Sequence, residues 1–239
     1  MLDKMYDADG IVFSVPIFAK GATGLFHTIM DRFGPRMDRG NNFAAAMISK
    51  EMGEKEIDPR FYTKNTVVSY IGVGGSDWAT RIECDFGIQA LTPMWKVIDN
   101  VNFQWSKSIV MEDEKVAVAH KVGENLANAA KDFDQAQFQS EEGVWPHCHS
   151  KEFYLTPGSG KDTCCLCGIE GKLELADGVT KFVFPEEQLA HAHDTMSGKK
   201  IHADDIQRNE GRLAELQKTD EFKRRKQAYI DFIAPVYSE

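Results

Sequence analysis

The sequence predicts an open α/β sheet of parallel strands, followed by a small cysteine-bearing module and a C-terminal helix. Two observations predict the sheet: apolar runs alternate with helical periodicity over residues 1–138, and two of these runs end in glycine-bearing loops. A third observation marks the module, because glycine, histidine and cysteine replace the periodic aliphatic residues from Glu141 onward. We therefore expect three segments, 1–138, 139–186 and 187–239.

The first expected strand spans residues 10–17, a continuous apolar run of the kind that is buried on both faces of a parallel sheet. A loop with Gly21 and Gly24 follows, and then a helix whose apolar residues recur at helical spacing until Gly34-Pro35 ends it. We expect this strand to be central in the sheet.

Two further strand and helix pairs continue the alternation. The expected strands are 66–75 and 95–103, and the expected helices are 77–90 and 113–133. Right-handed crossovers between such strands build an open α/β sheet. Residues 36–65 interrupt the alternation, and we expect them to form an insertion near the carboxyl edge of the sheet.

The last hundred residues have a different character. Residues 172–184 predict a hairpin with an Asp177-Gly178 turn. Residues 202–233 are charged and helical, with apolar positions available for packing.

Composition excludes several classes of protein. The chain has 239 residues, 28 Lys and Arg against 37 Asp and Glu, and a formal net charge of −9. No diffuse basic surface is therefore available to bind a nucleic-acid backbone. No run approaches the roughly 20 apolar residues of a membrane span, and the first ten residues lack the features of a secretion signal. We expect a cytoplasmic protein without nucleic-acid or membrane partners.

The glycine-bearing loops predict a ligand site. In an open α/β sheet, ligands bind outside the carboxyl ends of the strands. The loops at 14–24 and 72–78 combine bare backbone with an aromatic side chain each, which suits a flat heteroaromatic ligand. Glycines after a buried strand are also common as simple turn residues. Neither loop has the dinucleotide-binding fingerprint or a Gly-Lys-Ser/Thr phosphate loop.

One of these loops belongs to a longer motif. Residues 7–18, Asp-Ala-Asp-Gly-Ile-Val-Phe-Ser-Val-Pro-Ile-Phe, with Gly21, Thr23-Gly24 and the helix end Met-Asp-Arg-Phe at 30–33, resemble the flavodoxin-like NAD(P)H-dependent FMN reductases. The match is to that family's third strand and flavin loop. Val15 stands between Ser14 and Pro16, where the family joins serine or threonine directly to proline. Residues 71–76 resemble the family's second flavin loop, and the resemblance covers about residues 4–133.

The resemblance implies a flavodoxin-like fold and a noncovalently bound FMN whose ring lies between the two loops. Backbone amides around 17–20 and 74–76 would bond the ring edge, and no side-chain acid or base is required. Hydride would pass from NAD(P)H to FMN, and the electrons on to a quinone, a metal centre or another acceptor. The resemblance also implies a homodimer with the flavin near the interface. The residues that it assigns to FMN binding are Ser14, Pro16, Ile17, Phe18, Ala19, Lys20, Gly21, Gly72, Gly74, Gly75, Ser76 and Trp78.

The family's first strand, phosphate-binding loop, first helix and second strand have no counterpart in this sequence. We therefore expect an N-terminally truncated sheet, either in a fragment of a longer reading frame or in a protein that has lost its phosphate loop. Two other functions stay open: an interaction module on a flavodoxin-like scaffold without flavin, and an FMN electron carrier without reductase turnover.

Four of the five cysteines lie within twenty residues, while Cys84 stands alone. Cys164 and Cys167 form a Cys-x-x-Cys-Gly turn, in which two thiolates can face one tetrahedral metal ion. Residues 145–149, Trp-Pro-His-Cys-His, resemble a second knuckle in which Trp145 occupies the first ligand position.

We predict a zinc-ribbon-like module with a structural zinc. Its ligands would be Cys148, Cys164 and Cys167, with His147 or His149 as the fourth.

Three alternatives remain for the thiols: an iron–sulfur cluster, which uses four closely spaced thiolates, free thiols, and a redox dithiol. We expect Cys165 to be a bystander. The expectation for His191, His193 and His202 is that they are solvated.

Overall fold

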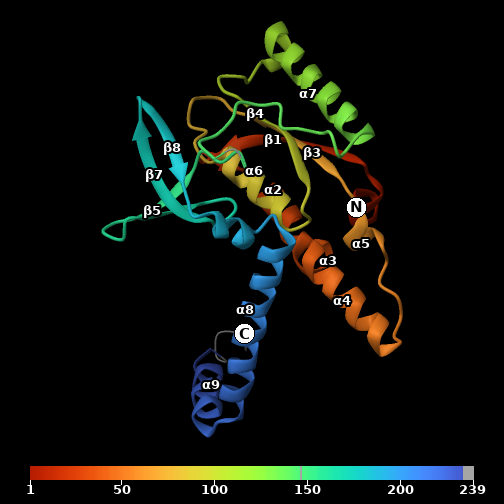
Figure 1. Cartoon of the computed structure of the whole chain (residues 1–239), viewed down its shortest axis with the longest axis vertical. Coiled ribbons are helices and arrows are strands. Elements are labelled where there is room, and N and C mark those ends of the chain that lie inside the picture. Colours follow the sequence, from red (N-terminus) through yellow and green to blue (C-terminus); the bar gives the residue numbers. More distant parts are fainter. Residues whose placement is uncertain (146, 234–239) are drawn as a thin grey trace. The chain divides into compact units, whose positions relative to one another are not determined.

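The computed structural model describes residues 1–145 and 147–233. Pro146 of the predicted second knuckle and the last six residues of the predicted C-terminal segment lie outside the described residues. The chain forms two compact units, one of residues 1–199 and one from Lys200 onward. The first unit contains two four-stranded sheets (Figure 1).

The first sheet is the predicted open α/β sheet, with the strand order β2-β1-β3-β4. Parallel pairing joins β1 to β3 and β3 to β4, whereas the short β2 is antiparallel to the end of β1. The strands are β1 (Gly10–Phe18), β2 (Gly21–Ala22), β3 (Val67–Val73) and β4 (Lys96–Phe103). The predicted strands of this sheet are therefore all present, with ends within two residues of the expected ones.

Helices cover both faces of this sheet (Figure 1). They are α2 (Gly24–Met30) and α6 (Ile82–Leu91) on one face and α7 (Asp113–Lys131) on the other. Alternate residues of β3 point to the two sides: Tyr70 packs with the first pair of helices, and Val67 and Ile71 pack toward α7. This alternation places a fully buried strand between two apolar layers.

The strand β1 differs from the prediction of a central strand buried on both faces. Val15 is buried, but Val12 is 43% exposed and Ser14 is exposed. In the described chain, β1 pairs along its length with β3 only, and its other side meets just the two residues of β2. An apolar run predicts a strand that is covered by a neighbouring strand on each side. Here the neighbour on one side, β2, has only two residues, so part of β1 stays exposed.

Residues 36–65 are largely helical and lie at the amino edge of the sheet, not at the carboxyl edge as expected. Arg39 N–H donates to Thr92 O just before β4, at 3.1 Å, and Arg39 Nε donates to Tyr62 O at 3.0 Å. Helix α2 precedes residues 36–65 and returns the chain to the amino edge of the sheet. An insertion after this helix must therefore begin at that edge. The elements at this edge are α1 (Leu2–Asp7), η1 (Asp31–Phe33), α3 (Gly34–Met37), α4 (Arg39–Met52) and α5 (Arg60–Thr63).

The second sheet, of strand order β5-β6-β7-β8, is antiparallel and belongs to the predicted ribbon-like module. Its strands are β5 (Phe153–Thr156), β6 (Lys161–Cys164), β7 (Glu170–Ala176) and β8 (Val179–Val183). The predicted hairpin is present, and Asp177 and Gly178 both have positive φ, 55° and 77°, as a type I′ turn requires.

The module packs against α6. A Cβ on Gly87 would lie 2.8 Å from Leu166 Cδ2, so glycine permits this close approach. Glu83 joins three elements: its carboxylate accepts from Asn102 Nδ2 at 2.8 Å and pairs with Lys151 Nζ at 2.9 Å. The module and α6 are thus held together by packing and by an ion pair.

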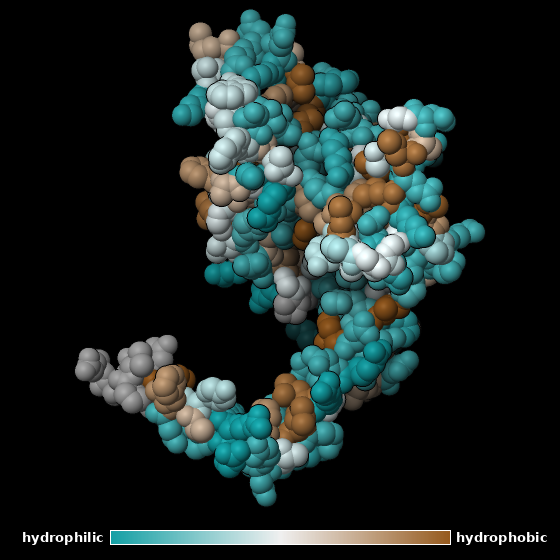
Figure 2. Space-filling view, turned by 90° about the vertical axis from the view of Figure 1, so that its left-hand side faces the viewer, coloured by the Kyte–Doolittle hydropathy of each residue, from teal (hydrophilic) through white to brown (hydrophobic). Residues whose placement is uncertain are grey.

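The short helices η2 (Ile109–Met111) and η3 (Glu186–His191) precede α7 and the C-terminal helices, respectively. The predicted C-terminal helix is interrupted at Thr219 and forms two helices, α8 (Met196–Lys218) and α9 (Asp220–Ile233). Many apolar side chains of these helices are exposed, and Figure 2 shows brown patches among the hydrophilic surface of this part of the chain. None of the described helices combines the length and apolarity that crossing a bilayer requires.

Candidate functional site

The two glycine-bearing loops meet at the carboxyl edge of the first sheet. The register that pairs Gly10 with Val67 also pairs Pro16 with Val73, so β1 and β3 end side by side. Arg81 N–H, just before α6, donates to Lys20 O at 3.0 Å. This bond joins the loop after β1 to the loop after β3, as the prediction of one shared ligand site requires.

The loop after β1 is a strained two-residue hairpin turn. Phe18 pairs with Gly21 across it, and the residues between them, Ala19 and Lys20, have φ of 48° and 75°. Turns of this kind prefer Asn-Gly because side chains disfavour positive φ. A non-glycine residue held in this region costs on the order of 1–3 kcal/mol, and such residues cluster at functional sites.

Asp85 fastens this hairpin to α6. Its buried carboxylate accepts from Ala22 N–H at 2.9 Å and from Arg81 Nη2 at 3.3 Å. His27 Nε2 lies 3.7 Å from the same carboxylate. Sequence reasoning missed Asp85, because Ala22, whose N–H its carboxylate accepts, lies 63 positions away in the chain.

We expect Gly21→Ala to destabilise the protein by about 1–3 kcal/mol, as overpacking does. A Cβ at this position would lie 2.1 Å from Asp85 Oδ2, which is held by its hydrogen bonds. Gly24→Ala is the matched control, since a Cβ there meets nothing within 4 Å. Urea denaturation of both variants measures the difference. Equal midpoints for the two would show that Asp85 does not hold the hairpin in place.

The loop after β3 is fixed at Gly74 and open beyond it. Gly74 N–H donates to Phe103 O and Gly74 O accepts from Ser106 N–H, both at 2.8 Å. The Gly74 amide is therefore not available to a ligand, contrary to our expectation. In the described chain, the backbone N–H groups of Gly75 and Ser76 donate no hydrogen bond. These two amides remain as candidate donors.

Glycine is required in this loop for close packing. Ile17 Cδ1 would lie 3.3 Å from a Cβ on Gly72 and 3.2 Å from one on Gly74. Ile17 thus lies beneath the loop, whereas Ser14 and Pro16 of the same strand are exposed. Of the residues assigned to FMN by resemblance, Ile17, Gly72 and Gly74 shape the site through packing.

Aromatic side chains and cations surround the open amides. Phe18 and Trp78 are each 70% exposed, and Trp105, after β4, is 67% exposed. Lys20 Nζ lies 5.5 Å from the centre of the Trp78 ring. A Cβ on Gly75 would lie 2.9 Å from Lys107 Cε. This edge therefore offers flat apolar surfaces and positive charge on a chain of net charge −9.

Asp77 lies in the loop after β3 and does not cap α6. The helix begins at Ile82, and its N-cap is Arg81. Asp77 O accepts instead from Ala79 N–H at 2.9 Å within the loop. The helix begins five residues later than expected, and the loop that faces the ligand site is longer by the same amount.

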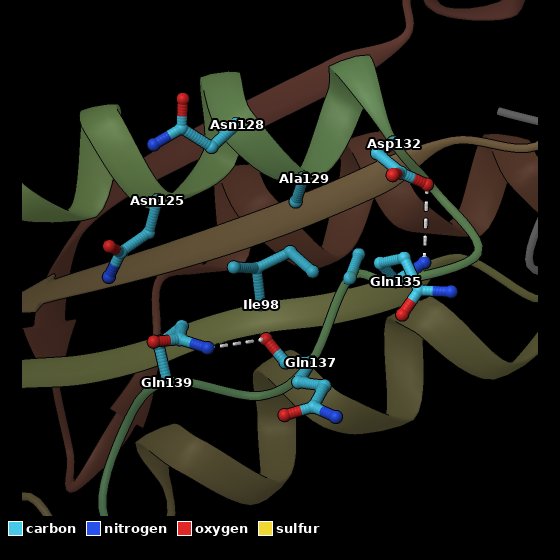
Figure 3. A pocket seen from close by; sticks show the side chains of 9 residues that line it. Ile98, Asn125, Asn128, Ala129, Asp132, Gln135, Gln137 and Gln139 are labelled. Carbon is cyan, nitrogen blue, oxygen red and sulfur yellow. Dashed lines mark hydrogen bonds between the residues drawn. The ribbon is translucent and has the colours of Figure 1, made fainter.

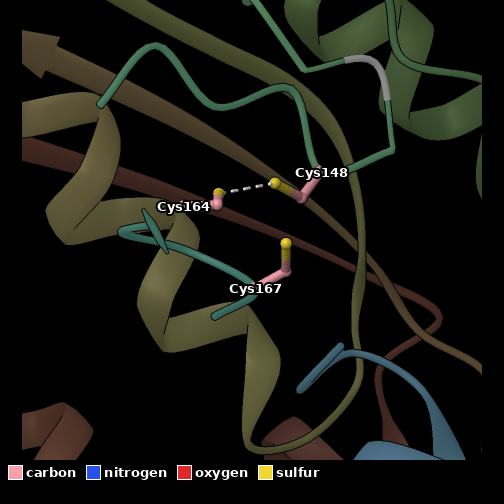
Figure 4. A group of neighbouring side chains, drawn as sticks. All are labelled: Cys148, Cys164 and Cys167. Carbon is pink, nitrogen blue, oxygen red and sulfur yellow. Dashed lines mark hydrogen bonds between the residues drawn. The ribbon is translucent and has the colours of Figure 1, made fainter. Parts of the chain in front are cut away.

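The module brings three of the predicted metal ligands together. The Sγ atoms of Cys148, Cys164 and Cys167 all lie within 4.8 Å of one another (Figure 4). Cys164 ends β6, and the tight turn to Cys167 closes with Gly168 at φ 79°. Cys148 comes from the turn before β5. Cys164 and Cys167 are buried, which removes water from their thiols.

The chemistry of this cluster fits a metal cation. Hydrogen bonding from Cys148 lowers the pKa of Cys164, and the same contact with Cys164 raises the pKa of Cys148. One thiolate therefore opposes ionisation of its neighbours while no cation is present. A divalent cation reverses this effect and holds deprotonated thiols at such distances.

Neither of the predicted histidines joins the three thiols. His147 Nε2 bonds to Asp194 Oδ1 at 3.0 Å, and this carboxylate raises the pKa of the imidazole. His149 Nδ1 bonds to Glu142 Oε2 at 2.7 Å, and its ring stacks on Phe138. Within the described residues, no ring nitrogen of either histidine completes a four-ligand group with the thiols.

Two other residues near the cluster take part in its packing. Trp145, at the knuckle position of a ligand, is buried against Phe184 with ring centres 4.2 Å apart, so it belongs to the module's core. His193 is exposed, as expected, and its backbone N–H donates to Cys167 O at 3.0 Å. The segment after η3 therefore packs on the knuckle, which spacing alone could not predict.

A separate polar pocket of about 230 Å³ lies between the C-terminal half of α7 and β4 (Figure 3). Amide side chains dominate its lining, among them Asn125, Asn128 and Gln139. Asn125 Nδ2 also donates to the buried Asp99 at 3.2 Å, and burial raises the pKa of that carboxyl. No residue of the predicted ligand or metal sites lines this pocket.

The fold and the loops define a class of protein. An open parallel sheet with ligand loops at the carboxyl ends of β1 and β3 is the arrangement of flavodoxin-like oxidoreductases. No family model matches the sequence, and no curated protein matches it. A solved structure described as a flavone reductase is 58% identical, with a TM-score of 0.92. The match covers 97% of this chain and 80% of that one. The chain therefore belongs to the flavodoxin-like reductase family of that protein.

Proposed function

We propose that the protein is an FMN-dependent NAD(P)H oxidoreductase. The observation that supports this most directly is the pair of open amides, Gly75 and Ser76, beside exposed aromatic rings where β1 and β3 end. When bound, FMN supplies the hydride-transfer chemistry. The chain contributes the binding surface for it.

The residues of the two loops have distinct tasks in this proposal. Gly75 and Ser76 donate N–H groups to the ring edge and stabilise negative charge there. Phe18 and Trp78 offer flat faces to aromatic rings. Ala19, Lys20 and Gly21 give the hairpin its shape, and Asp85 holds it in place. Ser14 and Pro16 form the exposed end of β1 that leads into it.

We propose a flat aromatic enone, of which flavone is an example, as the electron acceptor. The related structure is described as a flavone reductase, which supports this class of acceptor. The exposed rings of Phe18, Trp78 and Trp105 support it independently, because a planar aryl ligand can stack on them. The electrons would come from NADH or NADPH.

Titration with FMN and with riboflavin tests the cofactor assignment. We expect both FMN and riboflavin to lose fluorescence on binding. Their affinities should lie within about tenfold of each other, because the two loops would contact the flavin ring and not the phosphate. Quenching depends on Trp78, so Trp78→Ala should reduce it while Trp78→Phe retains binding.

Two results would contradict the oxidoreductase proposal. Absence of flavin binding would favour an interaction module on this scaffold. Flavin binding without NAD(P)H-dependent reduction of flavone or a quinone would favour an electron carrier.

We also propose that Cys148, Cys164 and Cys167 bind a structural zinc ion. The convergence of the three thiols supports a tetrahedral thiolate site with one further ligand. Among the described residues, three thiols form the group, one short of the four that an iron–sulfur cluster uses. A redox dithiol of Cys164 and Cys167 is the weaker alternative, because the Sγ atom of Cys148 lies within 4.8 Å of both.

A homodimer is our proposal for the assembly. Exposed apolar residues on α8 and α9 support an interface between copies, since large exposed apolar patches mark such surfaces. These residues are Ile206, Leu213, Leu216, Tyr229, Ile230, Phe232 and Ile233.

A further inference from the structure

Lys20 holds a backbone conformation that is unfavourable for lysine. Its φ is 75°, and it follows Ala19, which also has positive φ. Glycine adopts this conformation without a steric penalty. Lys20 is exposed, so burial of its side chain does not offset the strain. A function of the ammonium group would explain why lysine is tolerated here.

The ammonium lies at the rim of the candidate site. Lys20 Nζ is 5.5 Å from the centre of the exposed Trp78 ring, within the range of a cation–π contact. The bond from Arg81 N–H to Lys20 O, at 3.0 Å, anchors the residue between the two loops. The positive charge and the aromatic face are thus presented together.

Lys20 differs in its ion-pair partners from Arg81, another cation of this edge. Arg81 pairs with the buried Asp85, and Lys107 lies against Gly75. In the part of the chain that the structure describes, no carboxylate forms an ion pair with Lys20. Its charge is therefore available to an oxygen of a ligand that stacks on Trp78.

We propose that Lys20 binds the carbonyl oxygen of an aromatic enone acceptor whose ring lies against Trp78. This inference rests on the proposed function and names the residue that recognises its substrate. It makes Lys20 a catalytic residue, because its ammonium touches the oxygen on which charge develops.

The reaction has a defined electron balance. NAD(P)H is the reductant, and FMN bound at the two loops would supply the hydride that adds to the β-carbon of the enone. The π-electron pair of the carbon–carbon double bond then forms a new double bond between the α-carbon and the carbonyl carbon, and the π-electron pair of the carbonyl moves onto its oxygen. The resulting enolate takes a proton from water at the α-carbon, which gives the saturated ketone and NAD(P)⁺. An ammonium at the carbonyl oxygen stabilises the enolate charge.

The variants Lys20→Gly and Lys20→Arg test the proposal in the FMN-loaded protein. Glycine fits the backbone at this position, so the first variant should fold. The reduced holoprotein is mixed anaerobically with flavone, and separately with oxygen, and the reoxidation rates are measured. Oxygen needs no carbonyl recognition, so the ratio of the two rates isolates the effect on flavone. We expect Lys20→Gly to lower the ratio about 10- to 100-fold and Lys20→Arg to restore most of it.

Binding gives a readout without turnover. An ammonium at the carbonyl shifts the near-ultraviolet absorption of flavone to longer wavelength when flavone binds to the oxidised holoprotein. We expect the shift with wild type and Lys20→Arg and its loss with Lys20→Gly. A ratio within twofold of wild type in Lys20→Gly, with the shift retained, would overturn the inference. Wild-type reoxidation by oxygen but not by flavone would overturn it while sparing the FMN assignment, whereas failure to bind FMN would overturn both.

Discussion

Cys164→Ser is expected to abolish stoichiometric zinc binding and to unfold the second sheet at neutral pH. Cys164 is 1% exposed, and it touches both other thiols of the cluster. Metal binding to structural thiolate sites contributes on the order of 10 kcal/mol to folding, which exceeds what so small a module can gain from its core. Metal analysis of the purified protein gives the zinc stoichiometry, and near-ultraviolet circular dichroism reports the packing of Trp145.

Cys165→Ser is the matched control for this prediction. Cys165 lies in the same turn but is exposed, and it is not part of the thiol group. We expect this variant to retain one zinc ion per chain and the wild-type spectrum. Wild-type protein that purifies without metal, or Cys164→Ser protein that keeps it, would rule out the zinc proposal.

The second large effect is expected for Phe86→Ala, which should lower the free energy of unfolding by about 3–5 kcal/mol. Phe86 is 0% exposed, stacks on Tyr70 with ring centres 4.9 Å apart, and meets Phe26 edge to face at 5.3 Å. Phe86 is one of the residues through which α6 and α2 share one core with β3. Urea denaturation followed by circular dichroism measures the loss.

Tyr70→Phe is the comparison variant, at the ring that stacks on Phe86, and we expect no loss of stability from it. The Tyr70 hydroxyl is buried without a hydrogen-bond partner among the described residues, and burial raises its pKa. Removing an unsatisfied hydroxyl should leave stability unchanged or raise it by about 1 kcal/mol. A large loss in Tyr70→Phe, or a loss below 1 kcal/mol in Phe86→Ala, would contradict this view of the core.

Local sequence pattern predicted β3, because a parallel strand that is buried on both faces needs a nearly continuous apolar run. The pattern also predicted β4, although Asp99, Asn100 and Asn102 lie between its apolar residues. It also predicted the turn of β7 and β8, since Asp177-Gly178 determines that geometry locally. It misjudged the environment of β1, because burial depends on what lies beside a strand. The insertion at 36–65 was placed at the wrong edge, because position relative to a sheet is not a local property.

For the candidate sites too, local spacing was predictable from the sequence and distant partners were not. Cys-x-x-Cys spacing predicted that Cys164 and Cys167 would share a turn, and Cys148 joins them. The partners of His147 and His149 are Asp194 and Glu142, which no spacing rule connects to them. Asp85 escaped notice for the same reason, although it holds the hairpin of the first loop.

The contacts of Glu83 bear on how the module could be exchanged between proteins. One carboxylate serves Asn102 of β4 and Lys151 of the module, while Gly87 on the same helix leaves room for Leu166. A graft of residues 139–186 onto another sheet would lose both the acidic partner and the space for the leucine. Recombination that moves the module without α6 should therefore yield poorly assembled chimeras, so the two are expected to be inherited as one unit.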